Sequence, residues 1–215
     1  MRLYRHLNEL EDEPNRAMFE VLKRECAPWL KEAKKFQKGK FLWRGSQSSI
    51  KPDPKTGLDA KPVRKGRTPR DIPKNIHRML DDRMKKKFGW LPRSEGVFAT
   101  SSFTTAADFG IPYLFFPAGK FKFVYGIERQ GGRPISDVLG ALDRAGAIIW
   151  AQNQYKVDPE LSNVDLSVML DGFVGQFTDK NLAKGVLQGA EIMFNCRYYY
   201  LAEQEEGFSI SKLIW

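Results

Sequence analysis

The arrangement of short apolar segments constrains this chain most, because strand-like and helix-like patterns do not alternate regularly along it. Apolar residues at helical spacing predict a helix over 14–36, which we expect Pro28 to break, and a basic amphipathic helix over 75–88. Shorter helices are expected over 104–109, 136–145 and 165–172. Strands are expected over 41–44, 96–99, 120–125, 147–150, 190–201 and 208–215. A chain without regular β-α-β units favours an α+β fold over a doubly wound one.

Positive charge is concentrated in one part of the chain. The sequence holds 35 Lys and Arg against 26 Asp and Glu, a net charge of +9, and Lys51–Lys87 holds thirteen against five, a surplus of eight. Residues 50–72, rich in Pro, Gly and basic residues, predict a long surface loop. Such a segment attracts an anionic partner such as DNA, RNA or an acidic protein, although it is equally typical of a solvated surface. The helical pattern near the N-terminus and the position of the basic region divide the chain into two parts. We expect an N-terminal helical segment, 1–38, packed on a domain, 39–215, with a basic insertion at about 50–87.

Several functional classes are excluded by what the sequence lacks. A mean hydropathy of −0.46 and the absence of a long apolar run exclude a membrane-spanning helix. Cys26 and Cys196, the only cysteines, exclude a disulfide framework, and Cys196 lies in an apolar run typical of a core thiol. His6 and His77, the only histidines, form no metal-ligand pattern, so no metal is expected. Residues 1–16 contain no apolar stretch of signal-peptide length, so the expected compartment is the cytoplasm.

Three short segments carry side chains suited to binding or catalysis. Arg44 ends the expected strand 41–44 and is followed by Gly45, so its guanidinium could reach a phosphate. The hydroxyl run Thr100-Ser101-Ser102 follows the strand 96–99, where a helix cap explains it equally well. Glu191 opens an apolar strand in which hydrophobic patterning alone requires no charge. Each has an ordinary structural explanation when taken alone.

Together and in this order, the segments resemble the R-S-E pattern of the ADP-ribosyltransferases. Phe98-Ala99-Thr100-Ser101-Ser102 is similar to the aromatic-x-Ser-Thr-Ser signature of that family, with Thr100 at the first serine. Leu42-Trp43-Arg44-Gly45-Ser46 resembles the Leu-Trp-His-Gly-Ser of the poly-ADP-ribose polymerase branch, with Arg44 at the histidine. The resemblance implies a split, mostly antiparallel pair of sheets with surrounding helices, and a mono-ADP-ribosyltransferase that uses NAD+ as substrate without a metal.

The resemblance also assigns roles to residues. Glu191 would hold the 2′-hydroxyl of the nicotinamide ribose and stabilise the oxocarbenium-like transition state. Arg44 would bind the diphosphate or the adjoining ribose, and Gly45 would leave room for the ligand. The hydroxyls of Ser101 and Ser102 would orient Glu191 and line the ribose pocket, and Thr100 would also contact the NAD+. Nicotinamide would stack on Phe98 or Phe103.

One departure from the family pattern leaves the acceptor open. Arginine-modifying members carry Glu-x-Glu and related members Gln-x-Glu, whereas the position two residues before Glu191 is Gly189. Transfer to another macromolecule, protein or nucleic acid, and plain NAD+ hydrolysis both remain open, as does a basic nucleic-acid-binding module without catalysis. A compact basic enzyme of this kind would suit a phage or bacterial effector in a host cytoplasm. An RNA 2′-phosphotransferase on the same fold is less favoured, because that family relies on paired histidines.

Overall fold

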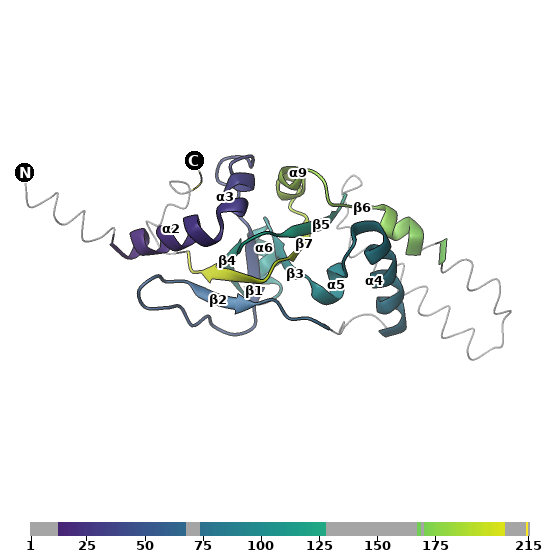
Figure 1. The fold of residues 1–215 in the computed structure, drawn as a ribbon, viewed down its shortest axis with the longest axis horizontal. Coiled ribbons are helices and arrows are strands. Elements are labelled where there is room, and N and C mark those ends of the chain that lie inside the picture. Colours follow the sequence, from purple (N-terminus) through teal and green to yellow (C-terminus); the bar gives the residue numbers. More distant parts are fainter. Residues whose placement is uncertain (1–12, 68–73, 128–166, 169, 205–213, 215) are drawn as a thin grey trace, which may run out of the picture.

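An eight-stranded antiparallel sheet forms the centre of the molecule (Figure 1) in a computed structural model that describes residues 13–67, 74–127, 167–168, 170–204 and 214. The strands are β1 (Trp43–Ser46), β2 (Asp59–Pro62), β3 (Val97–Thr100), β4 (Ile111–Pro117), β5 (Lys122–Gly126), β6 (Phe177–Thr178), β7 (Glu191–Asn195) and β8 (Tyr198–Ala202). Their order in the sheet is β2-β8-β4-β1-β3-β7-β5-β6. The α+β class expected from the sequence is therefore confirmed.

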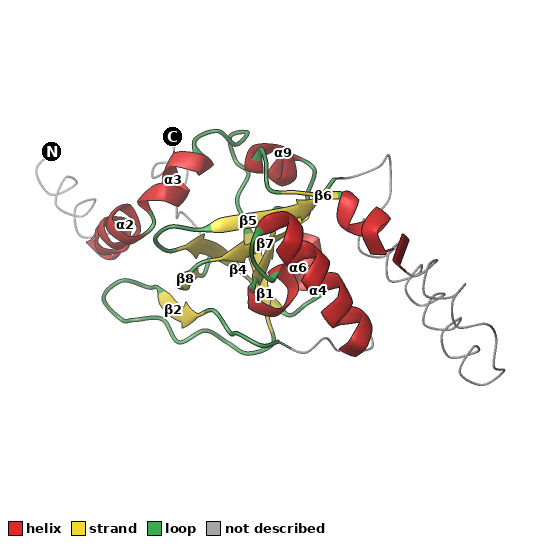
Figure 2. Ribbon diagram, turned by 45° about the vertical axis from the view of Figure 1, so that its right-hand side comes forward, coloured by secondary structure: helices red, strands yellow, loops and turns green. Residues whose placement is uncertain are grey.

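Helices cover this sheet from several sides (Figures 1 and 2). They are α2 (Glu13–Glu25), α3 (Ala27–Ala33), α4 (Lys74–Phe88), α5 (Pro92–Glu95), α6 (Phe103–Ala107) and α9 (Leu182–Leu187). Residues 170–175 are also helical. No helix in the described part of the chain is long and apolar enough to cross a membrane.

Strand β7 lies between two hydrophobic clusters because its side chains alternate between the faces of the sheet. Ile192 and Phe194 belong to the larger cluster, which includes Leu22 and Trp29 of α2 and α3. Met193 points into the smaller cluster, which includes Leu80 of α4. The first residue of β7, Glu191, therefore begins a strand that is buried on both faces.

The sheet narrows at one junction, between β1 and β3. These strands share only the pair Trp43↔Thr100, whereas β1 and β4 share four pairs and β3 and β7 another four. The resemblance led us to expect two sheets, and the described chain instead forms one sheet with a narrow middle. The two halves meet at Trp43, next to Arg44 in β1.

Several expected elements are present, and others differ. Pro28 lies in the first turn of α3, so the expected break in the N-terminal helix occurs just before it, and α4 coincides with the expected helix to within a residue. The expected loop over 50–72 is wrong in part because it contains β2, and the run over 190–201 is two strands rather than one. Strand β4 and helix α9 were not expected. The segments 136–145 and 147–150, and 208–215 apart from residue 214, lie outside the described residues.

Candidate functional site

Three adjacent strands at the middle of the sheet bring the three sequence segments together. Trp43, beside Arg44, is opposite Thr100 of β3, and Thr100 is in turn opposite Glu191 of β7. Neighbouring strands lie about 5 Å apart, so residues separated by nearly 150 positions in sequence share one small region.

Arg44 occupies the narrow junction between β1 and β3. Its Nη1 donates a hydrogen bond of 2.6 Å to the carbonyl oxygen of Phe98, and its guanidinium lies 5.6 Å from the centre of the Tyr199 ring. Continuing the β1–β3 register would bring Gly45 opposite Phe98, but no such pair forms. The Arg44 guanidinium thus binds an oxygen of β3 where the ladder between the two strands has ended.

Glu191 is half-buried at the start of β7. Burial raises the pKa of its carboxyl above the ordinary value, while the positive charges of Arg93, Arg67 and Arg44 act in the opposite direction. Three guanidinium groups from three separate segments thus act on one carboxylate. A half-buried region with this excess of positive charge is suited to an anionic ligand.

Two of these arginines were not expected from the sequence. Arg67 comes from the basic segment, residues 51–87, for which the sequence indicated partner binding rather than a place in the site. Its Nη1 donates to the carbonyl oxygen of Gly96 at 3.2 Å, and its guanidinium lies 4.8 Å from the centre of the Phe98 ring. Arg93 comes from α5. No pattern in the sequence distinguishes these two from the other arginines of a basic chain.

The hydroxyl run connects the end of β3 to the segment before Glu191. Thr100 Oγ1 donates to the carbonyl oxygen of Gly189 at 3.0 Å, and Ser101 Oγ donates to that of Val186. Ser102 Oγ accepts from the backbone N–H of Thr105 at 3.1 Å and caps α6. The bonds of Thr100 and Ser101 fix the turn that leads into β7, so they position Glu191 through the backbone.

The turn before Glu191 explains why Gly189 stands there. Gly189 has φ +71°, its N–H donates to Val186, and the N–H of Ala190 donates to Gly185. This pair of bonds is the Schellman arrangement that ends a helix, here α9, and it favours glycine at the left-handed position. A glutamate or glutamine at 189 would have to adopt a conformation that side chains other than glycine disfavour.

The remaining expected site residues lie around the same junction. Phe98 is half-buried beneath Arg67, whereas Phe103 is 49% exposed and contacts Trp43 edge-on at 5.0 Å between ring centres. A Cβ at Gly45 would clash with the carbonyl oxygen of Ala106 and lie 2.9 Å from the Cβ of Phe109. The space beside Gly45 is thus filled by α6 and the residues after it.

A buried polar cluster joins α4 to α5 next to Arg93. His77, Asp81 and Ser94 join α4 to α5: His77 Nε2 lies 2.9 Å from Ser94 Oγ, and that hydroxyl donates to Asp81 Oδ2. Asp81 Oδ1 also accepts the backbone N–H of Arg93 at 3.0 Å. The single hydroxyl proton of Ser94 is donated to Asp81. The hydrogen bond between His77 and Ser94 therefore requires a proton on His77 Nε2, which donates to Ser94 Oγ. The cluster therefore fixes the backbone that carries Arg93.

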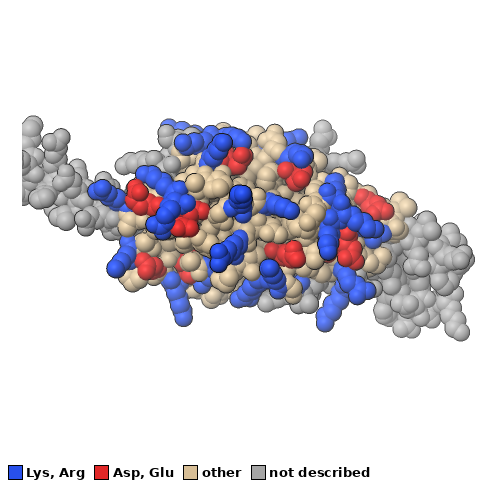
Figure 3. All heavy atoms as spheres, in the orientation of Figure 1, with Lys and Arg blue, Asp and Glu red and all other residues tan. Residues whose placement is uncertain are grey.

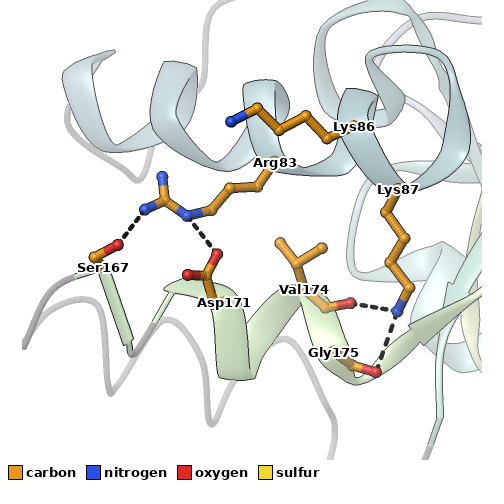
Figure 4. A pocket seen from close by; sticks show the side chains of 7 residues that line it. All are labelled: Arg83, Lys86, Lys87, Ser167, Asp171, Val174 and Gly175. Atoms are coloured by element: carbon orange, nitrogen blue, oxygen red, sulfur yellow. Dashed lines mark hydrogen bonds and ion pairs between the residues drawn. The ribbon is translucent and has the colours of Figure 1, made fainter.

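A hollow lies between α4 and residues 167–168 and 170–175, and two of its basic side chains bond to other parts of the fold (Figure 4). Arg83 donates to Asp171 at 2.8 Å and to Ser167, and Lys87 donates to the carbonyl oxygens of Val174, Gly175 and Phe177. Lys86 projects away from these contacts. We therefore do not treat this hollow as the functional site.

In the described part of the chain, no group of three His, Cys, Asp or Glu residues is arranged to hold a metal ion. Cys26 and Cys196 are both buried and unpaired, and burial raises the pKa of Cys196 to about 12. The expectation that Cys196 is a core thiol is confirmed.

Comparison with known proteins finds no matching family model, no matching curated protein and no matching solved structure. The geometry around Glu191 is therefore the basis on which a function can be proposed.

Proposed function

We propose that this chain is an NAD+-dependent mono-ADP-ribosyltransferase that acts on a macromolecular acceptor. The observation that supports this most is the half-buried carboxylate of Glu191, which is strand-paired with Thr100 and on which the charges of Arg44, Arg67 and Arg93 act. One carboxylate among several guanidinium groups suits a ligand that combines a diphosphate with a sugar on which positive charge develops.

In the proposed reaction Glu191 accepts a hydrogen bond from the 2′-hydroxyl of the nicotinamide ribose. The bond between C1′ of this ribose and the nicotinamide nitrogen breaks, and nicotinamide leaves with the bonding electron pair. The ionised Glu191 stabilises the positive charge that develops on the ribose. A nucleophile of the acceptor then bonds to C1′ and releases its proton to solvent.

The arginines bind the rest of the dinucleotide. Arg44, already directed into the β1–β3 junction, binds the diphosphate, and Arg67 and Arg93 add positive charge that acts on Glu191. Because Arg67 covers the ring of Phe98, the half-exposed Phe103 is the more accessible ring for stacking on nicotinamide.

A second candidate, NAD+ glycohydrolase, is favoured by one observation. Gly189 has no side chain with which to select an acceptor, and its place in the α9 turn disfavours one. Water would then take the place of the acceptor nucleophile, and the same residues would act on NAD+.

The test is incubation of the full chain with NAD+ labelled in the adenosine part, in the presence of a cell lysate. We expect nicotinamide release and label on a macromolecule, and a loss of about 100-fold or more in Glu191→Gln. Glu203→Gln, which neutralises an exposed carboxylate just after β8, serves as the matched control and should retain full activity. Nicotinamide release without transferred label would identify the glycohydrolase. Equal rates in wild type and Glu191→Gln would refute both.

A further inference from the structure

Part of the negative charge of the basic segment is turned into the fold. Two of its acidic residues, Asp59 and Asp81, are 6% and 3% exposed. Asp59 accepts the backbone N–H of Lys51 and pairs with Lys61, and Asp81 belongs to the cluster between α4 and α5. Their charges are thus directed into the fold, while most of the basic side chains project outward.

Eight exposed basic side chains of this segment form neither an ion pair nor a side-chain hydrogen bond among the described residues, and we call them the basic surface. They are Lys51, Lys55, Arg64, Lys65, Lys74, Arg78, Lys85 and Lys86. Figure 3 shows Lys and Arg side chains projecting along the lower edge of the molecule, from the β2 side to the α4 side. Arg83 and Lys87 are excluded from the basic surface because Arg83 pairs with Asp171 and Lys87 donates to backbone carbonyl oxygens.

The basic surface is connected to the candidate site through Arg67. The backbone N–H of Arg67 donates to the backbone carbonyl oxygen of Ser94 at 3.2 Å, and the Arg67 guanidinium lies over the Phe98 ring. Burial lowers the pKa of Arg67, and the charges of Arg44 and Arg64 lower it further. The charges of Arg64 in the basic surface and of Arg44 in the site thus both act on Arg67.

The chemistry of this surface fits a nucleic acid. Protein interfaces usually have an apolar centre, and binding of a basic surface to a membrane usually includes inserted apolar side chains. In the described residues 51–67 and 74–87, no large apolar side chain is exposed. Interfaces with nucleic acids are instead polar and strongly positive. Helix α4, with 15 residues, is roughly 22 Å long, which matches about six phosphates along one strand of a duplex.

We propose that the acceptor is a nucleic acid, held on the basic surface so that one of its nucleophilic groups reaches C1′ of the ribose beside Glu191. This inference rests on the proposed function for the transfer, whereas the binding does not depend on it. In the transfer, the C1′–nicotinamide bond breaks and a bond from the nucleic acid to C1′ forms, with nicotinamide and one proton released.

Binding is tested with the full chain and a labelled oligonucleotide, as DNA and as RNA, over a range of salt concentrations. Lys85→Gln combined with Lys86→Gln should weaken binding about tenfold and reduce the slope of log K against log salt by about 2. The matched control, Lys120→Gln combined with Lys122→Gln, removes two exposed charges at the β4–β5 turn and should leave the slope unchanged. Equal losses in the two double variants, or no binding by wild type, would overturn the proposal.

Transfer is tested with labelled NAD+ and the lysate, followed by separate nuclease and protease digestion. Label released by nuclease supports a nucleic-acid acceptor. Label released only by protease overturns this acceptor and leaves the proposed function standing. Oligonucleotide binding without nicotinamide release overturns the proposed function and the acceptor assignment together, while the basic surface remains a binding surface.

Discussion

At the scale of single residues, Glu191 is a carboxylate whose environment opposes its ionisation. Burial raises its pKa, and the nearby arginines only partly compensate. The folded state therefore holds this proton more tightly than the unfolded chain does. Such a residue lowers stability at neutral pH, which is typical of a functional group retained at a cost to the fold.

Replacement of Glu191 by glutamine should therefore stabilise the protein in a pH-dependent way. In wild type, stability falls as pH rises from the ordinary glutamate pKa through the raised pKa of Glu191, because the unfolded chain loses this proton first. Glu191→Gln lacks this loss, so its melting temperature should exceed that of wild type at pH 8, with the gap narrowing below pH 4. Thermal unfolding across this range measures the effect. A gap that is independent of pH would contradict it.

Gly189 provides a second prediction at this scale. Its φ of +71° is disfavoured for alanine, so Gly189→Ala should cost roughly 1–2 kcal/mol of unfolding free energy. Gly172→Ala is the control, because Gly172 is helical and an added Cβ would meet no atom within 4 Å. That change should be neutral or slightly stabilising in urea denaturation. Equal effects of the two changes would contradict the role assigned to the Gly189 turn.

At the scale of elements, local patterns predicted some of the structure and missed elements that depend on distant partners. Helix α4 was predicted because its apolar face follows helical spacing. Strand β4 was not predicted because Gly110 and Pro112 interrupt the local apolar run, yet Pro112 is the second residue of the strand and pairs with Gly45. Strand β2 has almost no apolar pattern and forms because the edge of β8 is available to it. Pairing of this kind cannot be inferred from a local window of sequence.

The same limit applies to the candidate site. Arg44, the hydroxyl run and Glu191 could be selected because each lies in a segment with a recognisable local pattern. Arg67 and Arg93 could not, because only the packing of α5 and the segment after β2 brings them close to Glu191. Conversely, Gly45 was assigned to ligand access, and the structure shows instead that α6 requires it.

The α4–α5 pair gives a prediction for an element that supports the site. Asp81→Ala removes the acceptor for Ser94 and for the backbone of Arg93, leaving buried donors unpaired. We expect a loss of about 1–3 kcal/mol in unfolding free energy and slower nicotinamide release in the fraction that stays folded. Asp82→Ala, at the exposed neighbouring position, should change stability by less than about 0.5 kcal/mol. If the two changes destabilise equally, the cluster does not hold the helices together.

At the scale of the whole molecule, positive charge from distant parts of the chain determines how the site responds to pH. Strand β1, the segment after β2 and helix α5 each contribute one arginine to the field at Glu191. These charges favour the ionised carboxylate that the proposed reaction requires, against the effect of burial. Nicotinamide release should consequently rise with pH through the raised pKa of Glu191.

Removing one of these charges should move that profile in a defined direction. Arg67→Gln takes away a charge that favours ionisation, so the pKa of Glu191 should rise further and the acidic limb of the rate profile should shift to higher pH. Lys65→Gln, which removes an exposed charge from the same segment, is the control and should leave the limb in place. The measurement is kcat/KM for nicotinamide release from pH 4 to 9. A profile that falls in height but keeps its midpoint would mean that Arg67 binds NAD+ without acting on Glu191.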